Sequence, residues 1–230
     1  MTLYAWVMLF SIVGPFALSF DKKVAFYKQW KALSIGILVN AVLFIVWDIW
    51  FTKKQIWGFN PAYTSSIKFW GLHIEELSFF IVVPYASVFI YACLKAYLKR
   101  GIQQQLVSWF NYIGMFMCLV AMVIFAHKTY TLVNTSIAFM LLAAHQFWLK
   151  KAYMTYFWIA YFVHLLPFVI INGVLTGAVT PNPIVWYSSD HIIGLRFVSI
   201  PIEDFIYALS CLLLPITIME AILVRQKQIL

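Results

Sequence analysis

Charged residues are scarce in this sequence. Asp, Glu, Lys and Arg make up only 10% of its 230 residues, whereas hydrophobic residues make up 64%. Soluble globular domains carry about 25% charged and about 45–50% apolar residues. The composition therefore argues against a water-soluble fold and favours a protein that is embedded in the lipid bilayer.

Cysteines and glycine-rich motifs are also few. Cys93, Cys118 and Cys211 all fall within apolar segments, and no CxxC pair occurs. Structural disulfides and metal-ligand spacings are therefore not indicated. The nine glycines are scattered, without the Gly-x-Gly-x-x-Gly fingerprint of dinucleotide binding. We expect neither a metal nor a flavin or nicotinamide cofactor.

Long apolar runs are what the sequence does contain. A run of about 20 apolar residues can cross the ~30 Å hydrocarbon core as a helix. Such runs predict an all-α integral membrane protein with seven transmembrane helices, in which any function lies inside the bundle or at its rim. The predicted spans are residues 2–20, 31–51, 74–97, 106–126, 130–149, 153–176 and 202–224.

The formal net charge of +8 comes from basic residues in the gaps between these spans. This pattern indicates membrane orientation rather than nucleic-acid binding. By the positive-inside rule, the more basic side is cytoplasmic, which places the N-terminus outside and the C-terminus inside a plasma or inner membrane. No basic residue precedes the first span, so we expect it to be retained. Eleven of the sixteen basic residues share one side: Lys22, Lys23, Lys28, Lys31, Lys95, Lys99, Arg100, Lys150, Lys151, Arg225 and Lys227.

The chain also repeats itself. Residues 67–79 and residues 195–207 both show a base, Phe, a small residue, Ile, two acids and an aromatic in the same register. With a gap of about four residues, the match extends upstream to residues 63–65 and 187–189. We predict two three-helix repeats, residues 1–100 and 129–230, joined by a linker helix in residues 101–128. An odd linker keeps both repeats parallel about an axis along the membrane normal.

Acidic residues are scarce, with only eight in the chain against sixteen basic ones. Four of them form adjacent pairs, Glu75 with Glu76 and Glu203 with Asp204, at the same end of spans three and seven. Acids in an apolar zone usually face the bundle interior and mark a functional site. Neighbouring helical residues point about 100° apart, so one acid of each pair should point inward. We expect both pairs to face a shared cavity. The structural alternative is a pair favoured by the helix dipole and bound to Lys68 or Arg196.

Other polar residues occupy matching positions in spans two and six. Asp48 corresponds to Asn172, and Asn40 corresponds to His164 eight residues earlier. These side chains either line the same cavity or form hydrogen bonds that hold helices together. No pair of histidines has metal-ligand spacing.

The motif Pro201-Ile202-Glu203-Asp204, its partner at residues 72–80 and the preceding residues 57–61 resemble the small membrane-embedded lycopene cyclase family. That family is built from a repeated three-helix domain, with a Pro-x-Glu-Glu-type motif in each copy. The resemblance covers nearly the whole chain. One departure is His73, which stands where the first copy of the family usually has Pro.

The resemblance implies a flavin-independent lycopene β-cyclase, an isomerase of the intramolecular lyase type. A carboxylic acid protonates a terminal double bond of the polyene, a neighbouring double bond captures the cation, and a base removes a proton. We expect Glu75 or Glu203 to donate, and Glu76, Asp204 or the opposite acid to receive. Pro201 favours Glu203 as the more rigid donor. The residues expected to bind the carotenoid or stabilise its cation are Phe79, Phe80, Phe205, Tyr207, His73, Asp48 and Asn172.

A membrane transporter or carrier with a 3+1+3 helix arrangement is the main alternative. It would be expected to show a polar midplane site, whereas the acids here lie near span ends among aromatic residues. A retinal photoreceptor needs a Schiff-base lysine in the last span, and residues 202–224 contain none. The sequence is compatible with a homo-oligomer or with association with other carotenoid enzymes. It leaves open the number and type of rings formed and the exact acyclic substrate.

Overall fold

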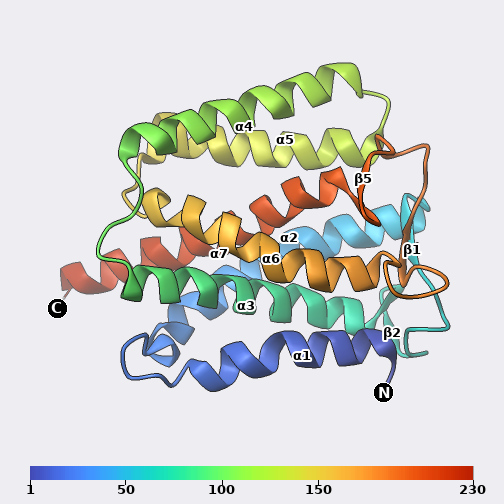
Figure 1. The fold of residues 1–230 in the computed structure, drawn as a ribbon, viewed down its shortest axis with the longest axis horizontal. Coiled ribbons are helices and arrows are strands. Elements are labelled where there is room, and N and C mark those ends of the chain that lie inside the picture. Colours follow the sequence, from blue (N-terminus) through green and yellow to red (C-terminus); the bar gives the residue numbers. More distant parts are fainter. Residues whose placement is uncertain (230) are drawn as a thin grey trace.

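The structure is a computed structural model that describes residues 1–229; Leu230, the last residue of the predicted second repeat, lies outside the described residues. The chain forms an elongated bundle of roughly aligned helices (Figure 1). The predicted all-α class is confirmed. The helices are α1 (Leu3–Leu18), α2 (Trp30–Lys53), α3 (Ile74–Tyr97), α4 (Gln104–Ile124), α5 (Thr129–Ala143), α6 (Met154–Leu175) and α7 (Ile202–Ile229).

Six of these helices are long and apolar enough to cross a membrane. Two short helical segments extend them, because a 3₁₀ turn, η1 (Phe26–Gln29), leads into α2 and a π-helical segment, η2 (Ala144–Leu149), continues α5. Helix α1 is also apolar but has only 16 residues. Whether α1 forms the seventh span therefore stays a prediction.

Short strands cover one end of the bundle, and the sequence did not predict them. β1 (Trp57–Phe59) pairs antiparallel with β4 (Val185–Tyr187), so that Trp57 lies opposite Tyr187. The hairpin of β2 (Lys68–Phe69) and β3 (Leu72–His73) precedes α3, and the hairpin of β5 (Arg196–Phe197) and β6 (Ile200–Pro201) precedes α7. The N-terminus lies at the same end and the C-terminus at the opposite end (Figure 1).

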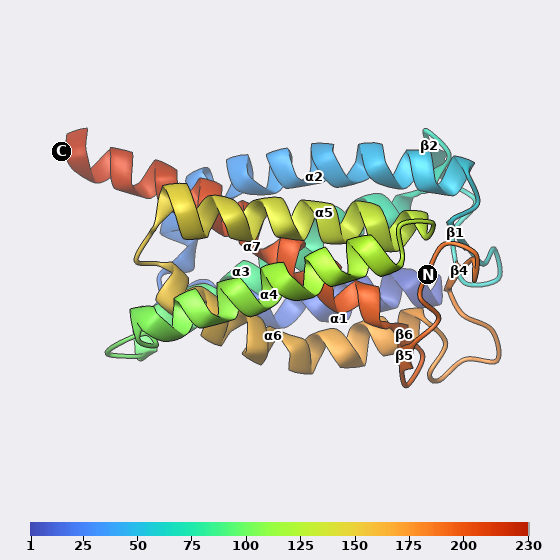
Figure 2. The ribbon, with the colours of Figure 1, turned by 90° about the horizontal axis from the view of Figure 1, so that it is seen from above.

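Helix α7 runs through the middle of the bundle in both views (Figures 1 and 2). It packs most closely on α2, where a Cβ added to Gly36 would lie 2.7 Å from the carbonyl oxygen of Pro215. Such close backbone approach between membrane helices depends on small residues at the interface. At the end opposite the strands, Glu220 of α7 accepts hydrogen bonds from Lys95 and Tyr91 of α3.

Matching backbone contacts accompany the two matching sequences. The amide of Ile74 donates to the carbonyl of Ile67 at 3.0 Å, and the amide of Ile202 donates to the carbonyl of Leu195 at 3.1 Å. Each hairpin thus closes onto the first residue of its helix. As a result, both acidic pairs enter the bundle at the same end.

Candidate active site

All four acids of the two motifs lie in the first turns of α3 and α7, where the helix dipole favours negative charge. Their side chains are buried, with exposed fractions of 8% or less. Within each pair the two side chains diverge, as adjacent residues on a helix must. The first acid of each pair and the second acid therefore meet different surroundings.

Glu75 is held by the segment that precedes its hairpin. Its Oε1 accepts hydrogen bonds from the Ser65 amide at 2.8 Å and from Thr2 Oγ1 at 2.7 Å, and its Oε2 accepts from Ser65 Oγ at 3.0 Å. Both carboxylate oxygens are thereby satisfied. Glu75 ties the loop and the start of α1 to the start of α3.

Glu203 makes two of the corresponding contacts in the second motif, both through Oε1, while its Oε2 is buried without a hydrogen-bond partner among the described residues. Its Oε1 accepts from the Ile193 amide at 2.6 Å and from Thr131 Oγ1 at 2.7 Å. The amide donor again lies ten residues before the acid. The position equivalent to Ser65 is thus Ile193, and these contacts do not follow the upstream sequence alignment that pairs Ser65 with Ser189.

The surroundings of Asp204 consist of hydrogen-bond donors. Tyr130 donates to Oδ1 at 2.6 Å, while Asn172 Nδ2 and the Tyr187 hydroxyl donate to Oδ2 at 2.8 and 2.9 Å. Burial and the nearby charge of Asp204 raise the pKa of Tyr187 in β4 well above its usual value, so Tyr187 remains a donor. Three donors on one carboxylate stabilise its charged form.

Glu76 has a different partner, a second acid. The Tyr4 hydroxyl donates to its Oε2 at 2.6 Å, and its carboxyl group interacts with that of Asp48 in α2. Asp48 is fully buried, and its Oδ1 accepts from Trp57 Nε1 at 2.5 Å and from Thr52 at 3.2 Å. Its Oδ2 is buried without a donor among the described residues.

Glu76 and Asp204 line the same small cavity, of about 50 Å³, which we call the acid cavity. The sequence prediction of a shared cavity thus applies to one acid of each pair. Glu75 and Glu203 do not belong to its lining. The other residues that line it are mostly aromatic: Tyr4, Trp57, Phe59, Phe79, Tyr130, Phe168, Asn172, Leu175, Val185, Tyr187 and Tyr207.

Three of the predicted substrate-binding residues, Phe79, Tyr207 and Asn172, line the acid cavity. Phe80 is packed in the apolar core instead. Phe205 packs against Phe168 and Phe197, with ring centroids 5.2 and 6.1 Å apart.

His73 also lies outside the lining of the acid cavity. It is buried, and its Nδ1 lies 2.6 Å from the Ser65 carbonyl oxygen, which fixes the hairpin of β2 and β3.

The aromatic donors Tyr4, Tyr130, Tyr187 and Trp57 were not predicted as site residues. Tyr4 and Tyr130 lie at the starts of α1 and α5, which pack beside the acidic motifs. Trp57 and Tyr187 are placed by the pairing of β1 with β4. Trp57 lies in a segment that carries the family resemblance and Tyr187 lies in the upstream repeat, whereas no sequence signal singled out Tyr4 or Tyr130.

The sequence left open that the motif acids form ion pairs with Lys68 or Arg196. Neither base forms such a pair in the structure. Arg196 instead donates to the carbonyl of Ser199. Among the side chains that the structure describes, the only ion pair is Lys95 with Glu220, at the far end of the bundle. Among residues 1–229, no cluster of three or more His, Cys, Asp or Glu could hold a metal ion.

A second space, the apolar cavity, adjoins the acid cavity and extends along α1, α3, α6 and α7. Its volume is about 270 Å³. Phe79, Phe168, Asn172 and Tyr207 line both spaces. His164 also lines the apolar cavity, whereas its sequence counterpart Asn40 is buried with no hydrogen-bond partner among the described residues.

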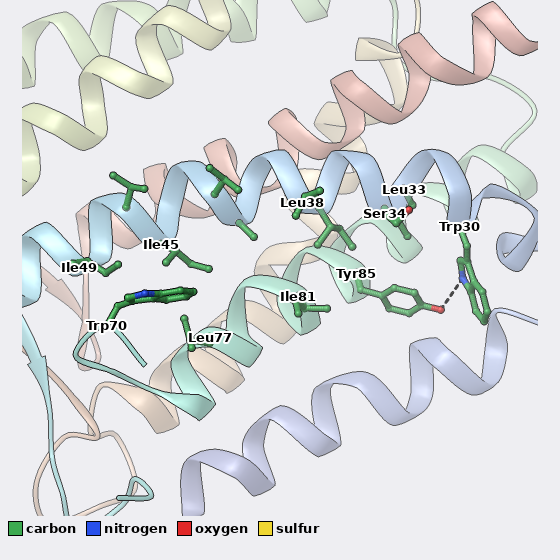
Figure 3. Close-up of a pocket in the computed structure, with 14 residues that line it drawn as sticks. Trp30, Leu33, Ser34, Leu38, Ile45, Ile49, Trp70, Leu77, Ile81 and Tyr85 are labelled. Atoms are coloured by element: carbon green, nitrogen blue, oxygen red, sulfur yellow. Dashed lines mark hydrogen bonds between the residues drawn. The ribbon is translucent and has the colours of Figure 1, made fainter. Parts of the chain in front are cut away.

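A third hollow, larger than the acid and apolar cavities, is a groove on the outside of α2 and α3, with a volume of about 880 Å³ (Figure 3). Trp70 lies at one end of this α2–α3 groove, and Trp30, hydrogen-bonded to Tyr85 at 3.2 Å, lies at the other. Neither acidic pair contributes to its lining, and it shares no lining residue with the acid or apolar cavity. The groove is therefore separate from the acids.

The fold and the site define a helical membrane protein in which acidic side chains face an aromatic cavity that continues into an apolar one. The sequence model of the lycopene cyclase family matches residues 1–94 and 127–222. The chain therefore belongs to the lycopene cyclase family, whose members act in carotenoid biosynthesis. No curated protein and no solved structure matches it.

Proposed function

We propose that this protein is a lycopene β-cyclase that forms β-ionone rings by acid-initiated, non-redox carbocation cyclisation. A proton adds to the terminal double bond of the acyclic polyene, the neighbouring double bond captures the resulting cation and closes the ring, and one proton leaves. The atoms balance without an oxidant or reductant, so the reaction is an isomerisation of the intramolecular lyase type. The observation that carries the proposal is that Glu76 and Asp204, from opposite motifs, line one aromatic cavity.

The proton donor in this proposal is the carboxyl pair of Glu76 and Asp48. Two buried carboxylates that touch repel each other strongly, and a shared proton relieves the repulsion. The donorless Oδ2 of Asp48 supports this assignment, since a proton held between the acids would satisfy it. Glu76 lines the cavity, so it is the member of the pair that can deliver the proton.

The base in this proposal is Asp204. Its hydrogen bonds from Tyr130, Asn172 and Tyr187 stabilise a carboxylate rather than a carboxylic acid. A carboxylate at this point also offsets the positive charge that develops on the closing ring. After each turnover, Asp204 releases the proton to solvent, and the Glu76 pair takes up a new proton from solvent.

Aromatic rings supply the remaining stabilisation of the cation. Trp57, Phe79 and Tyr207 line the acid cavity beside the two acids. A desolvated cation over an aromatic face is stabilised by about 2 kcal/mol. The same rings exclude water, which would otherwise trap the cation as an alcohol.

Glu75 and Glu203 act as positioning residues in this proposal. Each accepts a backbone amide and a threonine hydroxyl and so fixes the start of its helix. The reacting acid follows directly in the chain. A displaced first acid would move its neighbour relative to the cavity.

We further propose that residues 1–100 and 129–230 are parallel three-helix repeats around a linker in residues 101–128. Support comes from the family match, which leaves residues 95–126 unmatched, and from the parallel contacts of Glu75 and Glu203. The excess of basic residues on one side supports a plasma or inner membrane location with the acid cavity near the outer surface. The partner is a lipophilic carotenoid such as lycopene.

Purified protein in liposomes that contain lycopene, prepared in deuterated water, tests this function. We expect cyclic carotenoid of unchanged elemental composition, with one deuterium incorporated for each ring because the acid pair exchanges with solvent. Mass spectrometry of the separated pigments measures both. Unchanged lycopene, or rings without deuterium, would overturn the proposal.

A further inference from the structure

The cavities raise the question of how a long apolar substrate reaches acids that are covered by the loops. β1 and β4 contribute residues to the lining of the acid cavity at the strand end of the bundle. The apolar cavity leads away from this end along the helices. A route from the lipid therefore has to join the apolar cavity from the side.

A groove of about 350 Å³ between α1 and α6 meets the apolar cavity at such a point. Phe10 and Ser11 of α1, and Pro167 and Ile171 of α6, line both spaces. The α2–α3 groove is larger, but it shares no lining residue with either inner cavity. Continuity therefore singles out the α1–α6 groove.

The geometry points to a lateral portal between α1 and α6, through which one end of an acyclic polyene passes from the lipid to the acids. This inference rests on the proposed function and deepens it by naming the substrate's route. The path is the α1–α6 groove, then the apolar cavity, then the acid cavity. The walls of each space share residues with the next.

The chemistry of the walls fits an apolar polyene. The Ser11 hydroxyl donates to the Val7 carbonyl at 2.7 Å, so its proton is already engaged within α1. Phe10 is 73% exposed at the mouth. Ser11 carries the one polar side chain in the lining of the α1–α6 groove, so an apolar chain that crosses the groove leaves no polar side chain there unpaired.

The portal lies between two helices that are only loosely packed against each other. α1 and α6 pack sparsely compared with α1 and α3 or α2 and α7. Pro167 lacks an amide proton and so removes one backbone hydrogen bond from α6 at the portal. Both features allow α6 to move relative to α1 more easily than helices joined by dense packing.

A dead-end acid cavity with a side portal has a consequence for the products. Only one end of the polyene can reach the acids at a time, while the other end stays in the lipid. The new ring has to leave by the same route before the second end can react. A narrowed portal should therefore slow both rings and raise the share of monocyclic product.

Tryptophan scanning of α1 tests the portal. Ser11→Trp places an indole where the groove meets the apolar cavity, whereas Val13→Trp adds the same bulk at a 52% exposed position that lines none of the cavities described above. We expect Ser11→Trp to slow lycopene conversion in liposomes by about tenfold or more, through steric overpacking of the route. Val13→Trp should remain within about twofold of wild type, as exposed substitutions usually do.

A second variant obstructs the same route from a different helix, so that the test does not depend on the folding of Ser11→Trp alone. Ala86→Phe narrows the apolar cavity from α3, and it should also slow conversion and raise the monocyclic share. Membrane levels and thermal unfolding are measured for each variant. An active wild type with Ser11→Trp and Ala86→Phe both as fast as Val13→Trp would overturn the portal alone. An inactive wild type would overturn the proposed function instead.

Discussion

The two acidic motifs are alike in sequence and in backbone contacts, yet their cavity-facing acids have different neighbours. Glu76 meets the carboxyl group of Asp48, whereas Asp204 meets the amide of Asn172. Asp48 and Asn172 occupy matching positions in α2 and α6. In the proposed mechanism, this exchange of a carboxyl for an amide between the copies separates a site that retains a proton from one that retains a charge.

In the proposed mechanism, this difference lets a repeated fold supply both an acid and a base to one reaction. Equivalent positions with identical surroundings would favour the same protonation state in both copies. A second carboxyl group in the first copy favours a protonated acid there. An added hydrogen-bond donor in the second copy favours a carboxylate. The asymmetry lies in the neighbours, and the acidic pairs themselves are nearly the same.

The largest expected effect comes from removing either cavity acid. Glu76→Gln cannot donate a proton and Asp204→Asn cannot accept one, so each should slow ring formation by at least about 100-fold. Pigment analysis in a lycopene-accumulating host, normalised to membrane levels of the protein, measures the loss. Normal cyclisation by either variant would remove that residue from the mechanism.

Exchanging the two neighbours tests the comparison itself. Asp48→Asn deprives Glu76 of its carboxyl partner, and Asn172→Asp gives Asp204 one, so each change alone should reduce the initial rate by about tenfold or more. The double variant swaps the two environments. Its loss of initial rate should therefore be smaller than the product of the two fold-losses measured for the single variants. Strictly multiplicative losses would show that the neighbours do not set the acid and base roles.

Loss of one donor to Asp204 should have a smaller effect. Tyr187→Phe removes the hydroxyl that donates to Asp204 Oδ2 but keeps the ring, and we expect a rate reduction of about tenfold, the value of one charge-assisted hydrogen bond. Tyr207→Phe is the matched control. Tyr207 lines the same cavity, and its hydroxyl makes no hydrogen bond to Asp204. Equal losses in the two variants would contradict the role of the donor set.

The smallest effect on chemistry is expected away from both acids. Gly36→Ala drives a methyl group against the Pro215 carbonyl and should lower the free energy of unfolding by about 1–3 kcal/mol. The ratio of monocyclic to bicyclic product should not change. Thermal unfolding in detergent checks this, with Gly14→Ala as control, because an added Cβ there meets nothing within 4 Å. Equal stability of the two variants would show that α2 and α7 tolerate separation.

Much of the fold could be predicted because apolar runs and paired acids are local signals. The predicted span 74–97 coincides with α3, and the predicted start at residue 202 coincides with α7. The choice between the acids of each pair was beyond the sequence, because a 100° rotation separates them and helix packing decides which one faces inward. Pro201 favoured Glu203 as donor, yet Glu203 lies outside the lining of the acid cavity.

The remaining site residues depend on contacts between distant segments. Trp57 reaches Asp48 and Tyr187 reaches Asp204, and β1 and β4 come together from opposite halves of the chain. Strands of two or three residues carry no periodicity that a sequence pattern could reveal. The contact of Asp48 with Glu76 likewise requires the packing of α2 against α3.

Infrared difference spectroscopy tests most directly whether the first motif holds the proton and the second holds the charge. The carbonyl stretch of a protonated carboxylic acid is recorded for wild type, Glu76→Gln and Asp204→Asn in water and in deuterated water. We expect Glu76→Gln to perturb a deuterium-sensitive band of this kind and Asp204→Asn to leave it unchanged. A band perturbed by Asp204→Asn but not by Glu76→Gln would contradict the assignment of acid and base.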